Sequence, residues 1–316
     1  MAEIGKDIEK AKWILEQGDL VAIPTETVYG LAGNALNVTS ITKIFDVKNR
    51  PHFDPLIIHV PDIKGAEKYS EEIPKPAREL MERFWPGPLT LLLKRKSIIP
   101  DLVTSGLDTV GIRCPKHELT QQLLAELSFP LAAPSANPFG YVSPTKPEHV
   151  DEQLGDKIKY ILDGGDCKVG IESTIVGFED DILTIYRMGG LSVERLERIV
   201  GKVQAQTHSS SNPKAPGQLK SHYAPLKKVI LGDIEKLLLQ HSSSRVGLLS
   251  FKKDFHHAHQ FILSPSGNMD EAAQHLFTAL RELDKMPIDS ILVELVPELG
   301  LGKAINDRLI RAAALG

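Results

Sequence analysis

Apolar runs and helical repeats alternate along the chain. Short runs of consecutive apolar residues predict buried strands, because a strand covered on both faces has no polar side. These runs lie at residues 20–24, 54–60, 89–95, 109–115, 130–133, 159–166, 173–179 and 183–189. Apolar residues spaced three and four positions apart predict helices between them. These repeats lie at residues 6–17, 39–50, 75–85, 117–127 and 192–200. Such alternation is typical of an α/β protein.

The regular pattern stops after residue 203. Residues 204–225 are rich in Ser, Pro and Gly and lack periodicity, which predicts a linker. The pattern then resumes, with expected strands at 227–232, 245–251, 260–264 and 289–295, and expected helices at 233–241, 268–286 and 302–314. This second series predicts a small Rossmann-like α/β domain with a mostly parallel sheet.

The length of 316 residues suits about two domains. We therefore expect a first domain at 1–204, a linker at 205–226 and a second domain at 227–316. A loop as long as this linker is usually functional or disordered.

Composition and charge narrow the class of protein. A net charge of −4 argues against a general binder of polyanions. The two cysteines, Cys114 and Cys167, have neither disulfide nor zinc spacing. The N-terminal residues do not resemble a signal peptide, and no run is long enough to cross a membrane. We expect a soluble cytoplasmic protein without membrane contact and without a protein-held metal.

Polar residues concentrate where the predicted strands of the first domain end. The stretch Ala22–Ala35 begins as a strand, then brings Thr25, Glu26, Thr27 and Tyr29 together before expected turns at two glycines, Gly30 and Gly33. Ligands of α/β folds bind at such strand ends. Four cations accompany these polar loops: Lys48, Arg50, Arg113 and Arg187. This pattern predicts a pocket for phosphates or carboxylates, which guanidinium groups bind in pairs of hydrogen bonds.

Other kinds of functional site fit the sequence less well. The chain has no phosphate-binding loop motif, since residues 300–304 lack its first glycine and its hydroxyl residue. The three histidines of residues 255–259 have no cysteine beside them and are expected to be solvated. Cys114 has no evident base and is expected to pack as a small apolar residue. His59, alone in a strand, is more often structural than a ligand.

Seven motifs in order carry a resemblance to a known family. They are PTETVYGLA, KNRP followed by DPLIIHV, WPGPLT, VGIRCP, PSAN followed by SPT, STIV and YRMG. The chain resembles the YrdC family, and the APGQLKSHYAP linker with the unit after it resembles the long form of that family. The resemblance covers nearly the whole chain. It implies a YrdC-like twisted mixed sheet with a large open cavity, followed by a linker and the small α/β domain.

The resemblance also implies an activity. The family joins L-threonine, bicarbonate and ATP into L-threonylcarbamoyl-AMP and releases pyrophosphate, for threonylcarbamoyladenosine in tRNA. Positioning and charge neutralisation would carry most of the rate. Mg²⁺ would arrive on the ATP phosphates. The implied partners are a downstream threonylcarbamoyl transferase of tRNA modification and, through a weak contact, RNA.

Position by position, the resemblance implies two sets of site residues. Threonine would be bound by Thr27, His59, Arg113, Ala133 and Ser173. ATP would be bound by Lys48, Arg50, Asp54, Thr109, Ser135, Ser143, Arg187 and Tyr223. Lys48 and Arg50 would also act in catalysis, and Tyr223 would make the linker a lid. Asp54 stands where the family often has Asn, and its carboxylate would repel phosphate unless it faces Lys48, Arg50 or a metal.

Two alternatives start from the same fold. A double-stranded RNA-binding module would use a basic concave surface, against which the negative net charge argues. A carbamoyltransferase of hydrogenase maturation would need zinc fingers, for which two cysteines are too few.

Overall fold

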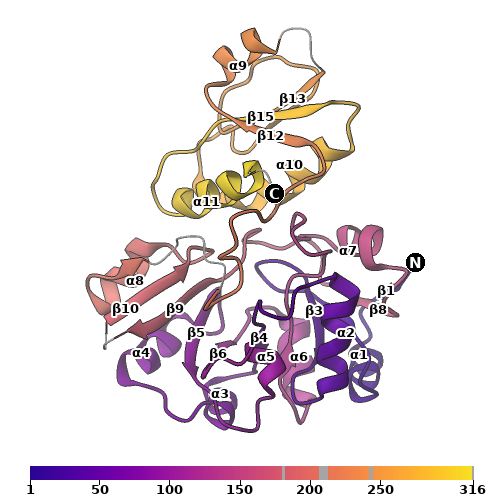
Figure 1. Cartoon of the computed structure of the whole chain (residues 1–316), viewed down its shortest axis with the longest axis vertical. Helices are drawn as coiled ribbons and strands as arrows, with labels where there is room; N and C mark the ends of the chain where they lie inside the picture. The colour runs from indigo at the N-terminus through magenta and orange to yellow at the C-terminus, as the bar shows by residue number, and fades with distance from the viewer. Residues whose placement is uncertain (180–181, 206–212, 242–244, 315–316) are drawn as a thin grey trace.

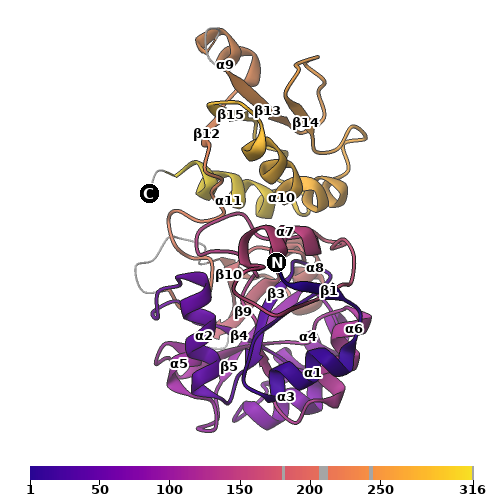
Figure 2. The same cartoon turned by 90° about the vertical axis from the view of Figure 1, so that its right-hand side faces the viewer.

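Two separate β-sheets divide the chain into two parts. The structure, a computed structural model, describes residues 1–179, 182–205, 213–241 and 245–314. The first part contains an 11-stranded sheet and the second a 4-stranded sheet. Figures 1 and 2 show the second part standing on the first, with helices α10 and α11 between the two sheets.

The large sheet is mixed, as predicted. Its strand order is β1-β8-β2-β3-β7-β4-β6-β5-β9-β10-β11. The strands are β1 (Glu3–Gly5), β2 (Val21–Ile23), β3 (Gly30–Asn34), β4 (Ile57–His59), β5 (Leu89–Lys94), β6 (Thr109–Arg113), β7 (Leu131–Ala132), β8 (Tyr160–Leu162), β9 (Thr174–Glu179), β10 (Ile182–Arg187) and β11 (Gln204–Ala205). β4 runs parallel to β6, whereas β5 runs antiparallel to it.

Helices connect these strands. They are α1 (Ile8–Glu16), α2 (Val38–Lys48), α3 (Ile63–Tyr69), α4 (Lys75–Phe84), α5 (Asp101–Thr104), α6 (Glu118–Glu126), α7 (Pro147–Leu154) and α8 (Val193–Val200). The longer ones bury one apolar face each. In α2, for example, Ile41, Ile44 and Phe45 lie in the main core at 0–1% exposure.

The small domain has a fully parallel sheet, which agrees with the prediction. Its order is β12-β15-β13-β14. The elements are β12 (Lys228–Leu231), α9 (Ile234–Gln240), β13 (Val246–Ser250), β14 (Gln260–Ile262), α10 (Met269–Lys285), β15 (Ser290–Val293) and α11 (Gly302–Ala313).

The two domains share an apolar core. Val28, Val142 and Ile171 of the first domain pack in one cluster with Phe277 of α10 and with Tyr223 of the linker. Burial of apolar surface is the main favourable term in such contacts, so the small domain is docked rather than tethered.

Six elements of the first part differ from the sequence prediction, and two of them are the short strands β1 and β11, which were not predicted. Helices α3, α5 and α7 were not predicted, because they are short and their apolar residues form no long repeat. The expected turns at Gly30 and Gly33 are wrong, since both glycines lie in strand β3. A Cβ on Gly33 would come within 2.9 Å of Leu20 Cδ2, so glycine is needed there for close packing rather than for a turn.

Candidate active site

A small cavity lies where strands of the large sheet meet the linker. Its volume is about 50 Å³, whereas ligand pockets measure roughly 300–1,000 Å³. Predicted residues that line it are Arg50, His59, Arg113, Ala133, Ser135, Ser173, Arg187 and Tyr223. Residues from both substrate sets therefore share one cavity, which is closed on the linker side by Pro216, Gly217, His222 and Tyr223.

Register in the sheet brings His59 and Arg113 together. They are directly paired at the ends of the parallel strands β4 and β6. Both side chains are buried, at 3% and 4% exposure. Burial, and next the charge of Arg113, lower the pKa of His59 to about 3. The imidazole is therefore neutral near pH 7 and offers hydrogen bonds rather than charge.

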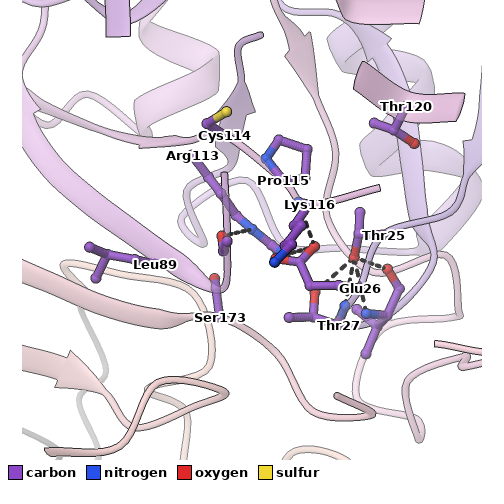
Figure 3. Close-up of polar contacts among 12 residues, drawn as sticks. Thr25, Glu26, Thr27, Leu89, Arg113, Cys114, Pro115, Lys116, Thr120 and Ser173 are labelled. Atoms are coloured by element: carbon purple, nitrogen blue, oxygen red, sulfur yellow. Dashed lines mark hydrogen bonds and ion pairs between the residues drawn. The ribbon is translucent and has the colours of Figure 1, made fainter. Parts of the chain in front are cut away.

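Arg113 is held by a carboxylate from the PTETVYG stretch. Its Nη2 lies 2.8 Å from Oε2 of Glu26, and the same oxygen accepts a hydrogen bond from the backbone N–H of Lys116. Figure 3 shows Glu26 between Arg113 and Lys116, with Thr25 and Thr27 beside it. Glu26 lines a second, larger cavity of about 1240 Å³, so the Arg113–Glu26 pair lies between the two cavities.

The remaining polar groups of this stretch shape the loop. Thr25 Oγ1 donates to the carbonyl of Val28 and lies 2.8 Å from Thr27 Oγ1. The Tyr29 hydroxyl donates to the carbonyl of Gly165 and accepts from the N–H of Gly164. Thr27 is fully buried and is not among the cavity-lining residues. Within the PTETVYG stretch, Val28 lines the small cavity, and Glu26 holds Arg113, which lines it as well.

Arg50 and Asp54 form a buried ion pair. Arg50 Nη2 lies 2.9 Å from Asp54 Oδ2, and both side chains are 4% exposed or less. Burial raises the pKa of Asp54, and the charges of Arg50 and Lys48 oppose this shift. The Asp54 carboxylate thus faces Arg50. This is one of the arrangements, expected from the sequence, in which Asp54 would not repel a phosphate.

Lys48 points to backbone oxygens rather than to the cavity. Its Nζ donates to the carbonyls of Ser135 and Asn137, each at 2.5 Å. Burial, and next the charge of Arg50, lower the pKa of Lys48. In this closed structure Lys48 therefore fixes the loop that carries Ser135.

Arg187 forms hydrogen bonds with both the STIV segment and the linker. Its Nε donates to the carbonyl of Ser173 at 3.0 Å, and its Nη2 to Ser173 Oγ at 3.1 Å. Its Nη1 donates to the carbonyl of Pro216. This guanidinium directly connects the first domain with the linker.

Besides Lys48 and Asp54, two further predicted ATP ligands do not line the cavity. Thr109 begins β6, whereas Arg113 ends it, so about 13 Å of strand separates them at about 3.3 Å per residue. Ser143 is fully buried behind the wall and donates to Glu172 Oε1 at 2.6 Å. Ser143 therefore acts on the cavity through Glu172, which does line it.

Sequence reasoning missed Glu26, Glu172, His222 and Arg308 as members of the site. Glu26 and His222 stand inside quoted motifs and Glu172 directly precedes STIV, so their signal was present. Arg308 lies in an amphipathic helix 136 positions from its partner Glu172, and no local pattern marks it.

The described parts of the chain contain no group of three or more His, Cys, Asp or Glu side chains placed to hold a metal ion. None of the described helices is long and apolar enough to cross a membrane. Both buried cysteines are free, and burial raises the pKa of Cys114 to about 11, which disfavours a thiolate nucleophile.

The fold and cavity define a two-domain α/β protein with a buried, guanidinium-lined site that its own linker closes. Residues 13–189 match the Sua5_yciO_yrdC family, described as telomere recombination. Residues 191–314 match Sua5_C, described as the C-terminal domain of threonylcarbamoyl-AMP synthase. The chain therefore belongs to the Sua5 long form of this family, the threonylcarbamoyl-AMP synthases.

Individual relatives agree over nearly the whole length. Threonylcarbamoyl-AMP synthase of Pyrococcus abyssi is 39% identical, over 97% of this chain and 94% of its own. That of Bacillus subtilis is 38% identical, over 97% and 92%. The crystal structure of P. abyssi Sua5 complexed with L-threonine superposes with a TM-score of 0.93 at 38% identity, covering 99% of this chain and 97% of that one.

Proposed function

We propose that this chain makes L-threonylcarbamoyl-AMP from L-threonine, bicarbonate and ATP, in the cavity described above. The observation that carries the proposal is the convergence of Arg50, Arg113 and Arg187 on one closed space. Three guanidinium groups suit a reaction that joins two anions, since like charges repel unless cations lie between them.

The chemistry divides into two steps. The threonine amine first attacks bicarbonate, which gives a carbamate and water. A carbamate oxygen then attacks the α-phosphorus of ATP, and the bond to pyrophosphate breaks in line. Neither step needs a protein nucleophile, which suits a cavity of cations, hydroxyl groups and one neutral imidazole.

Arg113 is assigned to the threonine carboxylate. Guanidinium binds carboxylate through two parallel hydrogen bonds, and Glu26 fixes its orientation. Neutral His59, paired with it in the sheet, is assigned to the hydroxyl or the carbamate. The backbone of Ala133 and the hydroxyl of Ser173 complete this side of the cavity, with Thr27 in the supporting loop.

Arg50 and Arg187 are assigned to the nucleotide, with Ser135 beside them. Lys48 and Ser143 support these groups from behind, and Asp54 holds Arg50. ATP enters as its magnesium complex, because a triphosphate brings a hydrated Mg²⁺ that needs few protein ligands. Thr109 has no role in this arrangement.

Linker residues 213–226 are assigned as a lid, within the expected span 205–226, of which residues 206–212 lie outside the described part. Tyr223 is 1% exposed and lines the cavity. The closed cavity is far smaller than a nucleotide site, so the lid has to open for ATP to enter. Closure would keep water from the labile mixed anhydride.

We place the reaction in the cytoplasm, upstream of a threonylcarbamoyl transferase that modifies tRNA, and the weak contact with RNA stays a prediction. The test is pyrophosphate release from the purified protein with each of threonine, bicarbonate and ATP omitted in turn. We expect release only when all three are present. Release that is independent of threonine would contradict the proposal.

A further inference from the structure

A charged residue of the small domain contacts a residue that lines the reaction cavity of the first domain. Arg308 lies in α11 and its side chain is 0% exposed. Its Nε donates to Oε2 of Glu172 at 3.0 Å, and its Nη1 lies 2.8 Å from Asp307. A buried guanidinium is costly unless it is paired, so these contacts fix α11 at one position on the first domain.

Glu172 needs a countercharge for the proposed reaction. Glu172 lines the cavity, and its carboxylate accepts hydrogen bonds from Ser143 and Arg308. A carboxylate that faces bound ATP would repel the triphosphate strongly in a space from which water is excluded. Arg308 neutralises this charge from behind, without occupying the cavity itself.

The same guanidinium supports the lid. Its Cζ lies 5.0 Å from the ring centroid of Tyr223, on a cation–π contact, and Phe277 of α10 stacks on Tyr223 at 5.7 Å. Tyr223 has φ of 62°, a left-handed conformation that a bulky residue adopts only when its surroundings hold it there. The small domain supplies part of those surroundings, together with Val28, Val142 and Ile171 of the first domain.

Helix α11 contacts the linker at two further points. Arg311 Nη1 donates to the carbonyl of Leu219, and the N–H of His222 donates to the carbonyl of Arg311 at 3.4 Å. Two lid residues between Gly217 and Tyr223 are thus tied to the helix that carries Arg308.

We propose that Arg308 is a positioning residue of the synthase, which neutralises Glu172 and holds Tyr223 over the nucleotide. The small domain then acts on the reaction cavity from behind, through Glu172 and Tyr223. This inference rests on the proposed function, because it takes ATP as the substrate. ATP is the anion that an unpaired Glu172 would repel.

The experiment is a double-mutant cycle on the full-length protein, with R308M, E172Q and R308M/E172Q. We expect R308M to raise the KM for ATP about tenfold or more, with a smaller effect on the KM for threonine, because the bared carboxylate acts on the triphosphate. E172Q in the R308M background removes that carboxylate. The double variant should therefore recover at least about threefold of the loss.

The control is R245M, which removes an exposed arginine–carboxylate pair with Asp289 in the same domain. It should keep both KM values. If R308M does not fold, R308K replaces it. Lysine keeps the positive charge, so R308K should retain most of the affinity for ATP. Adding E172Q to R308K should then leave the KM for ATP unchanged. Losses that simply add in the double variant, or equal changes in both KM values, would overturn the inference. If the wild-type protein releases no pyrophosphate with threonine, bicarbonate and ATP present, the proposed function is overturned instead.

Discussion

Arg113 and Glu26 form an ion pair of 2.8 Å in which both side chains are less than 8% exposed. The pair joins the end of strand β6 to the loop after strand β2. Since an arginine side chain has several free torsions, the carboxylate restricts the guanidinium to one direction at the edge of the cavity.

Substitution of Arg113 should separate the two substrates. R113A removes charge-assisted hydrogen bonds worth about 1.5–3 kcal/mol, so the KM for threonine should rise roughly 10- to 150-fold. The KM for ATP should change far less. Steady-state kinetics with each substrate varied in turn measures both values, and an equal loss for both would show that the threonine pocket is misplaced.

Substitution of Glu26 should act in the same direction but more weakly. E26Q keeps the shape and removes the charge that orients Arg113, so we expect the KM for threonine to rise about threefold to tenfold. The matched control is D101N, which removes the carboxylate that pairs with Arg95 at the surface. A KM for threonine as in the wild type would mean that Glu26 does not orient Arg113.

Closure of the lid should depend on Gly217. It has φ of +86°, and a Cβ there would lie 2.7 Å from the Tyr223 hydroxyl and 3.1 Å from Arg187 Cδ. We expect G217A to lower kcat/KM for ATP about tenfold or more, because Tyr223 and Arg187 must then move. G106A provides the control, since Gly106 has φ of +80° with nothing within 4 Å of the added Cβ. If G217A and G106A lower kcat/KM for ATP by the same factor, the loss comes from backbone strain at a positive φ and not from contact with Tyr223 and Arg187.

The Arg50–Asp54 pair should contribute to stability. D54N leaves a buried guanidinium without its countercharge, which typically costs about 3–5 kcal/mol in the free energy of unfolding. D289N breaks an exposed pair and should cost less than about 1 kcal/mol. Urea unfolding of the two variants measures the difference. Similar losses would show that Arg50 is compensated by other groups.

Acid should destabilise the fold through His59. Its pKa is about 3 in the folded protein because of burial, whereas an unfolded histidine titrates near 6.5. Below about pH 6.5 the unfolded state therefore binds the extra proton, and stability falls by up to about 1.4 kcal/mol per pH unit until the folded group also titrates. Between pH 7 and 5, the wild type should lose about 2 kcal/mol more than H59Q. Parallel pH profiles in urea unfolding would contradict this.

Local pattern determined much of the architecture. The linker composition at residues 204–225 predicted the division between the two sheets, and the strand–helix alternation after it predicted the parallel sheet of the small domain. The motifs also predicted that Arg50, Arg113 and Arg187 share one site. These features follow from periodicity, turn residues and motif order, which are written along the chain.

Tertiary structure decided the partners within the site. Lys48 binds backbone carbonyls instead of facing the cavity, Thr109 lies at the far end of its strand, and Arg308 joins Glu172 from another domain. Local sequence carries no record of which buried charges meet, because the match is set by strand register and by the docking of whole domains. The sequence by itself determined which strand ends are polar, and only the packed fold decided which of their charged residues line the cavity and which hold one another.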